Sequence, residues 1–334
     1  MRKSRLALAA VLLLAVLLTA AAALGLAWYR KPLPLPQSPF DFDVRPGASL
    51  ASVARMLHDA GVLRHPVVLT ALARVTKVDR TIKAGSYEID QGVTLAQLLA
   101  KLTQGDVTQT AITIVEGSTF ADLRRALREN PDVAQRVADL PDAELLARLG
   151  ASEPAPEGLF FPDTYYFAAG SSDLAVLSRA YRALQARLAA AWSRRAPELP
   201  LASPYDVLIL ASIVEKETAD AKDRPLIASV FINRLKRGMR LQTDPAVIYG
   251  MGARFDGNLR KRDLDADSPY NTYQRDGLPP TPIALPSQAS LDAVVDPPQT
   301  PYLYFVSRGD GSSEFSANLI AHNRAVSKYQ KGGR

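Results

Sequence analysis

Two carboxylates stand at the end of an apolar run in the second half of the chain. The run Val207–Val214 contains one polar side chain, Ser212, and leads directly into Glu215, Lys216 and Glu217. A helix that is apolar on every side belongs in a protein interior. Side chains two residues apart on a helix diverge by about 200°. We therefore expect a buried helix that ends in two glutamates facing different surroundings.

A carboxyl group beside apolar walls is suited to general acid catalysis. Burial penalises the charged form, so the pKa of such a group rises. A raised pKa is what protonation of a glycosidic oxygen requires. The residues alone do not choose between the two glutamates. The alternative is that both are solvated carboxylates at a helix end, paired with Lys216 or Lys222.

Other catalytic chemistries lack their residues. The chain has no cysteine, which excludes disulfides, thiolate nucleophiles and cysteine-based metal sites. Its only histidines are His58, His65 and His322, which lack the paired spacing of zinc hydrolases. There is no Walker-A pattern, dinucleotide fingerprint or G-x-S-x-G elbow. Carboxylates remain, and we expect neither a metal nor a cofactor.

Polar and aromatic residues follow the carboxylates. Amide and carboxylate groups alternate with tyrosines and rigid prolines between residues 240 and 323. Such a mixture suits sugar rings, which offer apolar C–H faces and many hydroxyls. The alternative is that the tyrosines form the core beside a β-hairpin, which the pattern of residues 303–315 predicts. We expect a sugar cleft lined by Gln242, Asp244, Tyr249, Asn271 and Tyr273.

The N-terminus predicts a membrane anchor. Residues 1–5 include Arg2, Lys3 and Arg5, and the next 23 residues, 6–28, carry no charge. About 20 apolar residues span a bilayer, whereas a signal peptide has an apolar core of roughly 7–15 residues. We expect a single-pass anchor in the inner membrane, with a cytoplasmic N-terminus and a periplasmic body. Cleavage within 20–23 is the alternative.

The net charge of +6 takes its meaning from this placement. Outside the cytoplasm the available polyanions are lipid headgroups and cell-wall polymers, so we expect no nucleic-acid partner. One local basic cluster follows an apolar helix, and it is either a solvated helix end or a substrate-facing patch. The cluster comprises Arg234, Lys236, Arg237 and Arg240.

The fold class is expected to be α+β. After the cytoplasmic tail (1–5) and the anchor (6–28), we expect a spacer followed by three folded regions. A Pro-rich spacer over 29–39 leads to a module over 40–106. Its strand, two helices and strand resemble a LysM-type carbohydrate-binding unit, although a mere spacer is the alternative. An intermediate α/β region over 107–196 includes a strand at 112–115 and a helix capped by Ser118 or Thr119. The catalytic domain is expected over 197–330.

Several motifs give the chain a resemblance to a known family. The motifs are "EGLFFPDTY" (157–165), "ASIVEKET" (211–218), "SVFINRLKRGMRLQTDPAVIYGMG" (229–252), "YNTYQRDGLPP" (270–280) and "TPYLYFV" (300–306). They resemble those of the endolytic murein transglycosylases, the MltG or YceG-like family. The resemblance implies a membrane-bound periplasmic enzyme that cuts nascent peptidoglycan glycan strands near the membrane and ends their elongation. It also implies peptidoglycan synthases as partners.

The resemblance places the catalytic glutamate at Glu215. It implies that this one carboxyl group protonates the oxygen between N-acetylmuramic acid and N-acetylglucosamine. The same group then takes the proton of the muramoyl 6-hydroxyl, which closes a 1,6-anhydro ring. Glu217 is expected to bind or orient substrate. The alternatives are a hydrolytic muramidase, in which Asp244 or Glu217 activates water, and a non-catalytic wall-binding scaffold.

Two positions depart from the family pattern. Thr281 stands where the family often has glycine, and Ser313 lies near the place where a histidine often occurs. If that histidine takes part in the reaction of other members, its role here is absent or moved. Neither departure touches Glu215.

Overall fold

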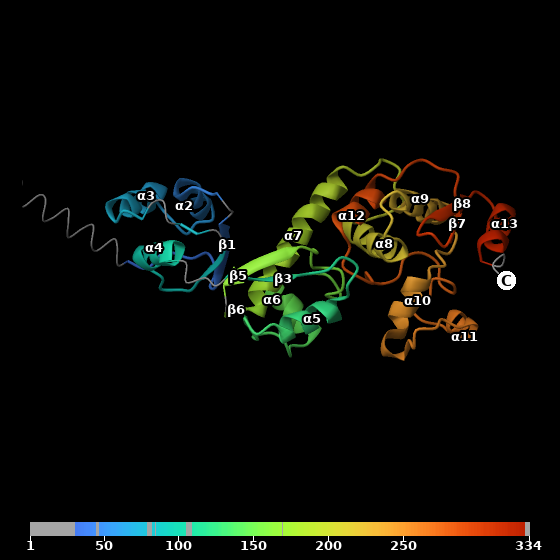
Figure 1. The fold of residues 1–334 in the computed structure, drawn as a ribbon, viewed down its shortest axis with the longest axis horizontal. Coiled ribbons are helices and arrows are strands. Elements are labelled where there is room, and N and C mark those ends of the chain that lie inside the picture. Colours follow the sequence, from blue (N-terminus) through green and yellow to red (C-terminus); the bar gives the residue numbers. More distant parts are fainter. Residues whose placement is uncertain are drawn as a thin grey trace, which may run out of the picture. The chain divides into compact units, whose positions relative to one another are not determined.

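The computed structural model describes residues 31–330, apart from 45–46, 79–81, 84, 105–108 and 169. The predicted tail and anchor, residues 1–28, lie outside the described residues. Within the described part, no helix is both long enough and apolar enough to cross a bilayer. The chain forms two compact units (Figure 1). The first extends to Ala111 and includes Tyr166–Ser171, and the second contains Ile112–Tyr165 and Ser172–Arg334.

The first unit has the strand, helix, helix, strand order that the sequence predicts. Strand β1 (Phe40–Val44) pairs antiparallel with β2 (Gly85–Ile89), and the helices α2 (Leu50–Asp59) and α3 (Pro66–Val75) lie between them in the chain. Helix α4 (Leu95–Gln104) follows. Ser49 caps α2, because its side chain accepts a hydrogen bond from the backbone N–H of Ser52. The relation to LysM-type units stays a prediction.

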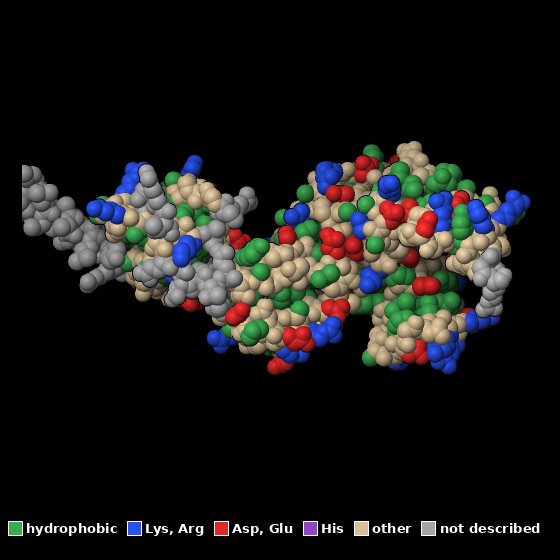
Figure 2. All heavy atoms as spheres, viewed as in Figure 1, with side chains coloured by type: hydrophobic (Ala, Val, Ile, Leu, Met, Phe, Trp, Pro, Cys, Tyr) green, Lys and Arg blue, Asp and Glu red, His purple; other side chains and the backbone are tan. Residues whose placement is uncertain are grey.

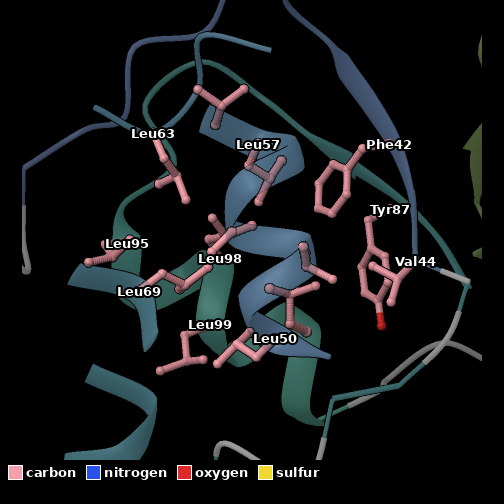
Figure 3. Close-up of a cluster of buried hydrophobic side chains, with 14 of the residues drawn as sticks. Phe42, Val44, Leu50, Leu57, Leu63, Leu69, Tyr87, Leu95, Leu98 and Leu99 are labelled. Carbon is pink, nitrogen blue, oxygen red and sulfur yellow. The ribbon is translucent and has the colours of Figure 1, made fainter. Parts of the chain in front are cut away.

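One apolar cluster holds this unit together (Figure 3). Leu57, Leu69 and Leu98, from α2, α3 and α4, are fully buried in it. The chain before β1 joins this packing, because the Leu33 N–H donates to the Val93 carbonyl at 2.7 Å and Leu33 packs against the cluster. The predicted spacer is therefore attached to the module at Leu33.

The second unit begins with short strands and helices. Strand β3 (Gln109–Thr113) pairs with β5 (Thr164–Ala168), and β4 (Val133–Ala134) pairs with β6 (Ser171–Ser172). The division between the units passes through β3, β5 and β6. The strand predicted at 112–115 is β3, which begins earlier, at Gln109, and ends at Thr113. The helices of this region are α5 (Phe120–Glu129), α6 (Asp142–Leu149) and α7 (Asp173–Ser193). Thr119 caps α5 in a capping box with Asp122, as one of the two predicted caps.

The rest of the second unit surrounds helix α8 (Pro204–Glu217), which packs against α7, α9 (Asp223–Lys236), α10 (Asp244–Met251) and α12 (Gln288–Val295). A 3-10 turn, η1 (Gly252–Arg254), and the short helix α11 (Lys261–Asp265) follow α10. The predicted hairpin is confirmed as β7 (Tyr304–Ser307) and β8 (Ser313–Ser316), with Phe305 opposite Phe315. Helix α13 (Leu319–Tyr329) ends the described chain. The predicted boundary between 196 and 197 lies inside this unit.

Candidate active site

Helix α8 delivers both glutamates, as its apolar sequence predicts. Its start is fixed by a capping box, in which the Ser203 side chain and Asp206 exchange hydrogen bonds with each other's backbone N–H groups. All eight residues of 207–214 are buried. The helix ends at Glu217, where Thr218 turns to an extended conformation. Glu215 and Glu217 therefore lie in the last turn of a buried helix, with different neighbours.

Glu215 is tied to the first turn of α12. Its Oε2 accepts hydrogen bonds from the Ser287 backbone N–H (2.9 Å), the Ser287 hydroxyl and the Ser290 hydroxyl (2.7 Å). Arg224 Nη2 lies 3.7 Å from Oε1, and the Glu215 side chain is only 6% exposed. A backbone N–H and a guanidinium can donate but cannot accept. Glu215 therefore accepts hydrogen bonds from the groups around it.

Glu217 has a different environment. Burial raises its pKa to about 7, and the negative charge of Asp244 adds to this rise. The Thr243 hydroxyl donates to Oε1 at 2.5 Å, and this bond and the Arg234 charge oppose the rise without cancelling it. At neutral pH this carboxyl group therefore occupies both its protonated and its ionised state. Glu217 therefore has the raised pKa that a general acid requires.

Two cavities of the second unit meet at Glu217. The first has a volume of about 810 Å³ and is lined by residues 113–117, 162–164 and 215–219 together with Arg224, so it contains both glutamates. The second has a volume of about 590 Å³ and lies between the 241–244 segment, the β7–β8 hairpin and α13. Glu217 lines both cavities, whereas Glu215 lines the first.

Three of the five predicted cleft residues line the second cavity. They are Gln242, Asp244 and Tyr273, and all three share it with Glu217. The Tyr273 hydroxyl donates to Asp244 Oδ1 at 2.6 Å. The backbone of Gln242 is left-handed, with φ at 51°, and its Oε1 accepts a hydrogen bond from Arg234 at 3.1 Å. The second cavity thus brings together the carboxyl groups of Glu217 and Asp244, the phenol of Tyr273 and the amide of Gln242.

The other two predicted cleft residues line neither cavity. Asn271 is 0% exposed, and its amide group donates to the backbone carbonyls of Asp263, Leu264 and Ala266. Tyr249 donates its hydroxyl to the buried Glu157 at 3.1 Å. Asn271 therefore holds the loop after α11, and the half-buried Tyr249 is tied to Glu157. These placements differ from the expected sugar contacts, because both polar groups are already used by the protein.

Arg234 lines the second cavity and differs from a solvated helix end. The sequence left its basic cluster open as either a solvated helix end or a substrate-facing patch, and the structure shows Arg234 buried, with donation to the carbonyls of Leu241 and Leu303. Its guanidinium also lies 5.0 Å from the centre of the Tyr304 ring. The spacing offered a signal, since Arg234 follows the buried Val230 and Phe231 by four and three residues on one face of α9.

The remaining predictions concern absences and departures. Within the described chain, no three His, Cys, Asp or Glu side chains are grouped as a metal ion would need. Ser313 lines the second cavity. Thr281 is buried, where its hydroxyl lies 2.8 Å from the Tyr270 hydroxyl and donates to the Pro282 carbonyl. A glycine at this position would lack the hydroxyl that makes both of these contacts.

Replacing Asn271 by Ala tests the placement of that side chain. The change removes the amide from three backbone carbonyls, so we expect the free energy of unfolding to fall by about 1–3 kcal/mol. Asn258→Ala, at an exposed position before α11, is the matched control and should stay within about 0.5 kcal/mol of the parent. Urea unfolding measures both. Equal stability of the two variants, with activity lost only in Asn271→Ala, would restore the cleft assignment.

Replacing Glu217 by Gln tests its burial. The folded pKa is about 7 against an ordinary value of 4.5, so ionisation opposes folding. This cost grows as the pH rises from about 4.5 to about 7 and is complete above that window. Glutamine has no such cost. We expect Glu217→Gln to raise the melting temperature more at pH 8 than at pH 5, relative to the parent at each pH.

The matched control for that measurement is Glu215→Gln. This change weakens the acceptor that holds Ser287 and Ser290, so it should lower the melting temperature at both pH values. A Glu217→Gln variant with the same gain at pH 5 and pH 8 would show that Glu217 is not desolvated.

The chain is similar to several known proteins. The model of the YceG-like family matches residues 42–328. The endolytic murein transglycosylase of Bacillus subtilis (strain 168) is 31% identical in an alignment of 306 positions, which covers 86% of this chain and 84% of that protein. The endolytic murein transglycosylase of Streptococcus pneumoniae (strain D39) is 26% identical over 85% of this chain and 57% of its own length.

A solved structure gives the same result. The crystal structure of a YceG-like protein from Listeria monocytogenes superposes with a TM-score of 0.54 at 27% identity, and it covers 85% of this chain and 98% of that chain. The family model spans nearly the whole described part, including both glutamates. The chain therefore belongs to the YceG-like family.

Proposed function

We propose that this protein is an endolytic murein transglycosylase, which cleaves peptidoglycan glycan strands between N-acetylmuramic acid and N-acetylglucosamine. One observation carries the proposal: Glu217, whose pKa is raised to about 7, lies where two cavities meet. An acid there has room for sugars on both sides of the bond that it protonates. Two relatives are named for this activity, and one of them aligns with 86% of the chain.

The proposed mechanism uses one carboxyl group twice. Protonated Glu217 donates its proton to the glycosidic oxygen, and the bond from that oxygen to C1 of the muramoyl residue breaks. Ionised Glu217 then accepts the proton of the muramoyl 6-hydroxyl as O6 bonds to C1, which forms the 1,6-anhydro ring. The enzyme ends in its starting state. A pKa near the working pH suits this exchange of roles.

Neighbouring side chains position this reaction. Thr243 holds one oxygen of Glu217 in place through its 2.5 Å hydrogen bond. Asp244 favours the protonated form of Glu217 by its charge, and Tyr273 orients Asp244. Because Asp244 lines the same cavity as Glu217, it is also the candidate base in a hydrolytic muramidase. The product separates the two reactions, since an anhydro end is lighter than a hydrolysed end by one water.

This assignment exchanges the roles that the sequence resemblance suggested for the two glutamates. Glu215 is engaged by three donors on Oε2 and has Arg224 beside Oε1. We propose that Glu215 is a positioning residue, which fixes the last turn of α8 against α12. Glu217 is free of such ties except for Thr243 among the described residues.

We also propose the cellular setting that the N-terminal sequence supports. The uncharged run 6–28 serves as a single-pass anchor in the inner membrane, with the N-terminus in the cytoplasm and the body in the periplasm. Cleavage of nascent strands close to that membrane would end their elongation. Peptidoglycan synthases are the proposed partners because they make these strands.

The pair Glu217→Gln and Glu215→Gln tests the catalytic assignment. Glutamine keeps the shape but cannot exchange the proton, so we expect Glu217→Gln to lose about 10²–10⁴-fold in the rate of anhydro-end formation. Glu215→Gln should lose much less once the rate is corrected for the folded fraction. Mass spectrometry of fragments from purified glycan strands, with melting curves alongside, measures both.

Three outcomes of that experiment contradict the proposal in different ways. A dead Glu215→Gln with a nearly normal Glu217→Gln would reverse the assignment. Fragments with hydrolysed ends would show a muramidase. Absence of any cleavage by the folded parent would favour a wall-binding scaffold.

The pH dependence of the rate gives a second test. The form of Glu217 that begins the reaction is protonated, so kcat/KM should fall as the pH rises through about 7. Burial also raises the pKa of Glu157 to about 7, but Glu157 lines neither cavity. The matched control is therefore Glu157→Gln, which should keep the falling limb. Loss of this limb in Glu157→Gln would assign it to the wrong carboxyl group.

A further inference from the structure

The outer face of α3 in the first unit is apolar and exposed. Helix α3 turns Leu69 and Ala73 to the core, while Val67 and Val75 on its other side are 71% and 81% exposed. Ala71, one turn after Val67, is also exposed. Single exposed apolar residues are common on protein surfaces. A row of them along one helix needs a partner, and the described residues supply none.

Cationic side chains border this face. From Ala60 to Val78 the chain contains three Lys or Arg residues, and its nearest acidic residues in sequence, Asp59 and Asp79, lie just outside this stretch. The basic residues are Arg64, Arg74 and Lys77, and all three are exposed. Figure 2 shows blue side chains of Lys and Arg around the end of this unit that carries α3. Exposed aliphatic side chains bordered by cations are typical of surfaces that lie on anionic bilayers.

The path of the chain brings this face close to the proposed anchor. Lys31 and Pro32 line a cavity of about 220 Å³ together with Arg64, His65 and Val68. The uncharged run ends at residue 28, and three extended residues reach at most about 10 Å. The headgroup layer on each side of a bilayer is about 5–8 Å thick. A unit attached at Lys31 therefore cannot leave the membrane surface.

We propose that the outer face of α3, formed by Arg64, Val67, Ala71, Arg74 and Val75, docks on the anionic headgroups of the membrane that holds the anchor. This inference rests on the anchor of the proposed function. Val67 and Val75 enter the interface between headgroups and acyl chains, while Arg64 and Arg74 contact phosphate groups. The covalent tether makes this docking intramolecular, so a weak surface is sufficient.

Site-specific labelling of the full chain tests the docking. Because the chain has no cysteine, Val67→Cys introduces a single attachment point for an environment-sensitive fluorophore. The labelled chain is placed in vesicles of phosphatidylcholine and phosphatidylglycerol that carry a nitroxide quencher at headgroup depth. The matched control is Asp43→Cys, an exposed position on β1, which Figure 1 shows at the opposite end of this unit from α3.

We expect the label at 67 to be quenched several-fold more than the label at 43. Adding Arg64→Glu and Arg74→Glu should remove most of that difference, as should vesicles of phosphatidylcholine alone. Equal quenching at 67 and 43 in chains that float with the vesicles overturns the docking. Strong quenching at 67 that ignores lipid charge overturns the anionic partner, and energy transfer between labels of two copies would identify a second chain as the partner.

Two readouts separate this inference from the proposals on which it rests. A chain that fails to float with the vesicles shows that the anchor is absent, and the docking proposal falls with it. Cleavage of glycan strands by the same preparation in detergent reports on the transglycosylase function independently of the membrane.

Discussion

The bond between Glu215 and the first turn of α12 is the contact on which the rest of the site depends. Residues 72 and 75 positions later in the chain, Ser287 and Ser290, close on one carboxylate oxygen. This tie fixes the last turn of a helix whose central residues, 207–214, are held mainly by apolar packing. Once the last turn of α8 cannot rotate, the side chain two residues further on has one direction to take. Glu217 then reaches the junction of the cavities because Glu215 is held elsewhere.

This arrangement divides two tasks that a single carboxyl group cannot combine. A carboxylate surrounded by donors is well oriented but is committed to accepting hydrogen bonds. A buried carboxyl group with few partners has a raised pKa. Within three residues, α8 therefore presents one side chain that is held by Ser287 and Ser290 and another whose pKa is raised to about 7. Lys216 between them adds to the same structure by donating to the Gly117 carbonyl at 3.1 Å across the first cavity.

The parts that the sequence predicted correctly are those that short-range rules determine. The cap at Thr119 and the hairpin after Leu303 follow from residues within a few positions of each other. The divergence of the two glutamates follows from helix geometry alone. Their hydrogen-bond partners do not, because the donors to Glu215 and Glu217 come from segments 26 to 75 residues away. Asn271 and Tyr249 were expected to contact sugar, whereas the structure pairs Tyr249 with Glu157, 92 residues earlier, and Asn271 with carbonyls 5 to 8 residues earlier. No pattern in the sequence marked either set of partners.

The backbone of Gln242, which lines the second cavity, is strained. Its φ of 51° is a conformation that residues with a side chain seldom adopt. Residues held there cost on the order of 1–3 kcal/mol. Glycine would relieve that strain but would remove the amide oxygen that meets Arg234. The next residue, Thr243, is the one that holds Glu217. Stability of the backbone and the geometry of the cavity wall therefore place opposite demands on position 242.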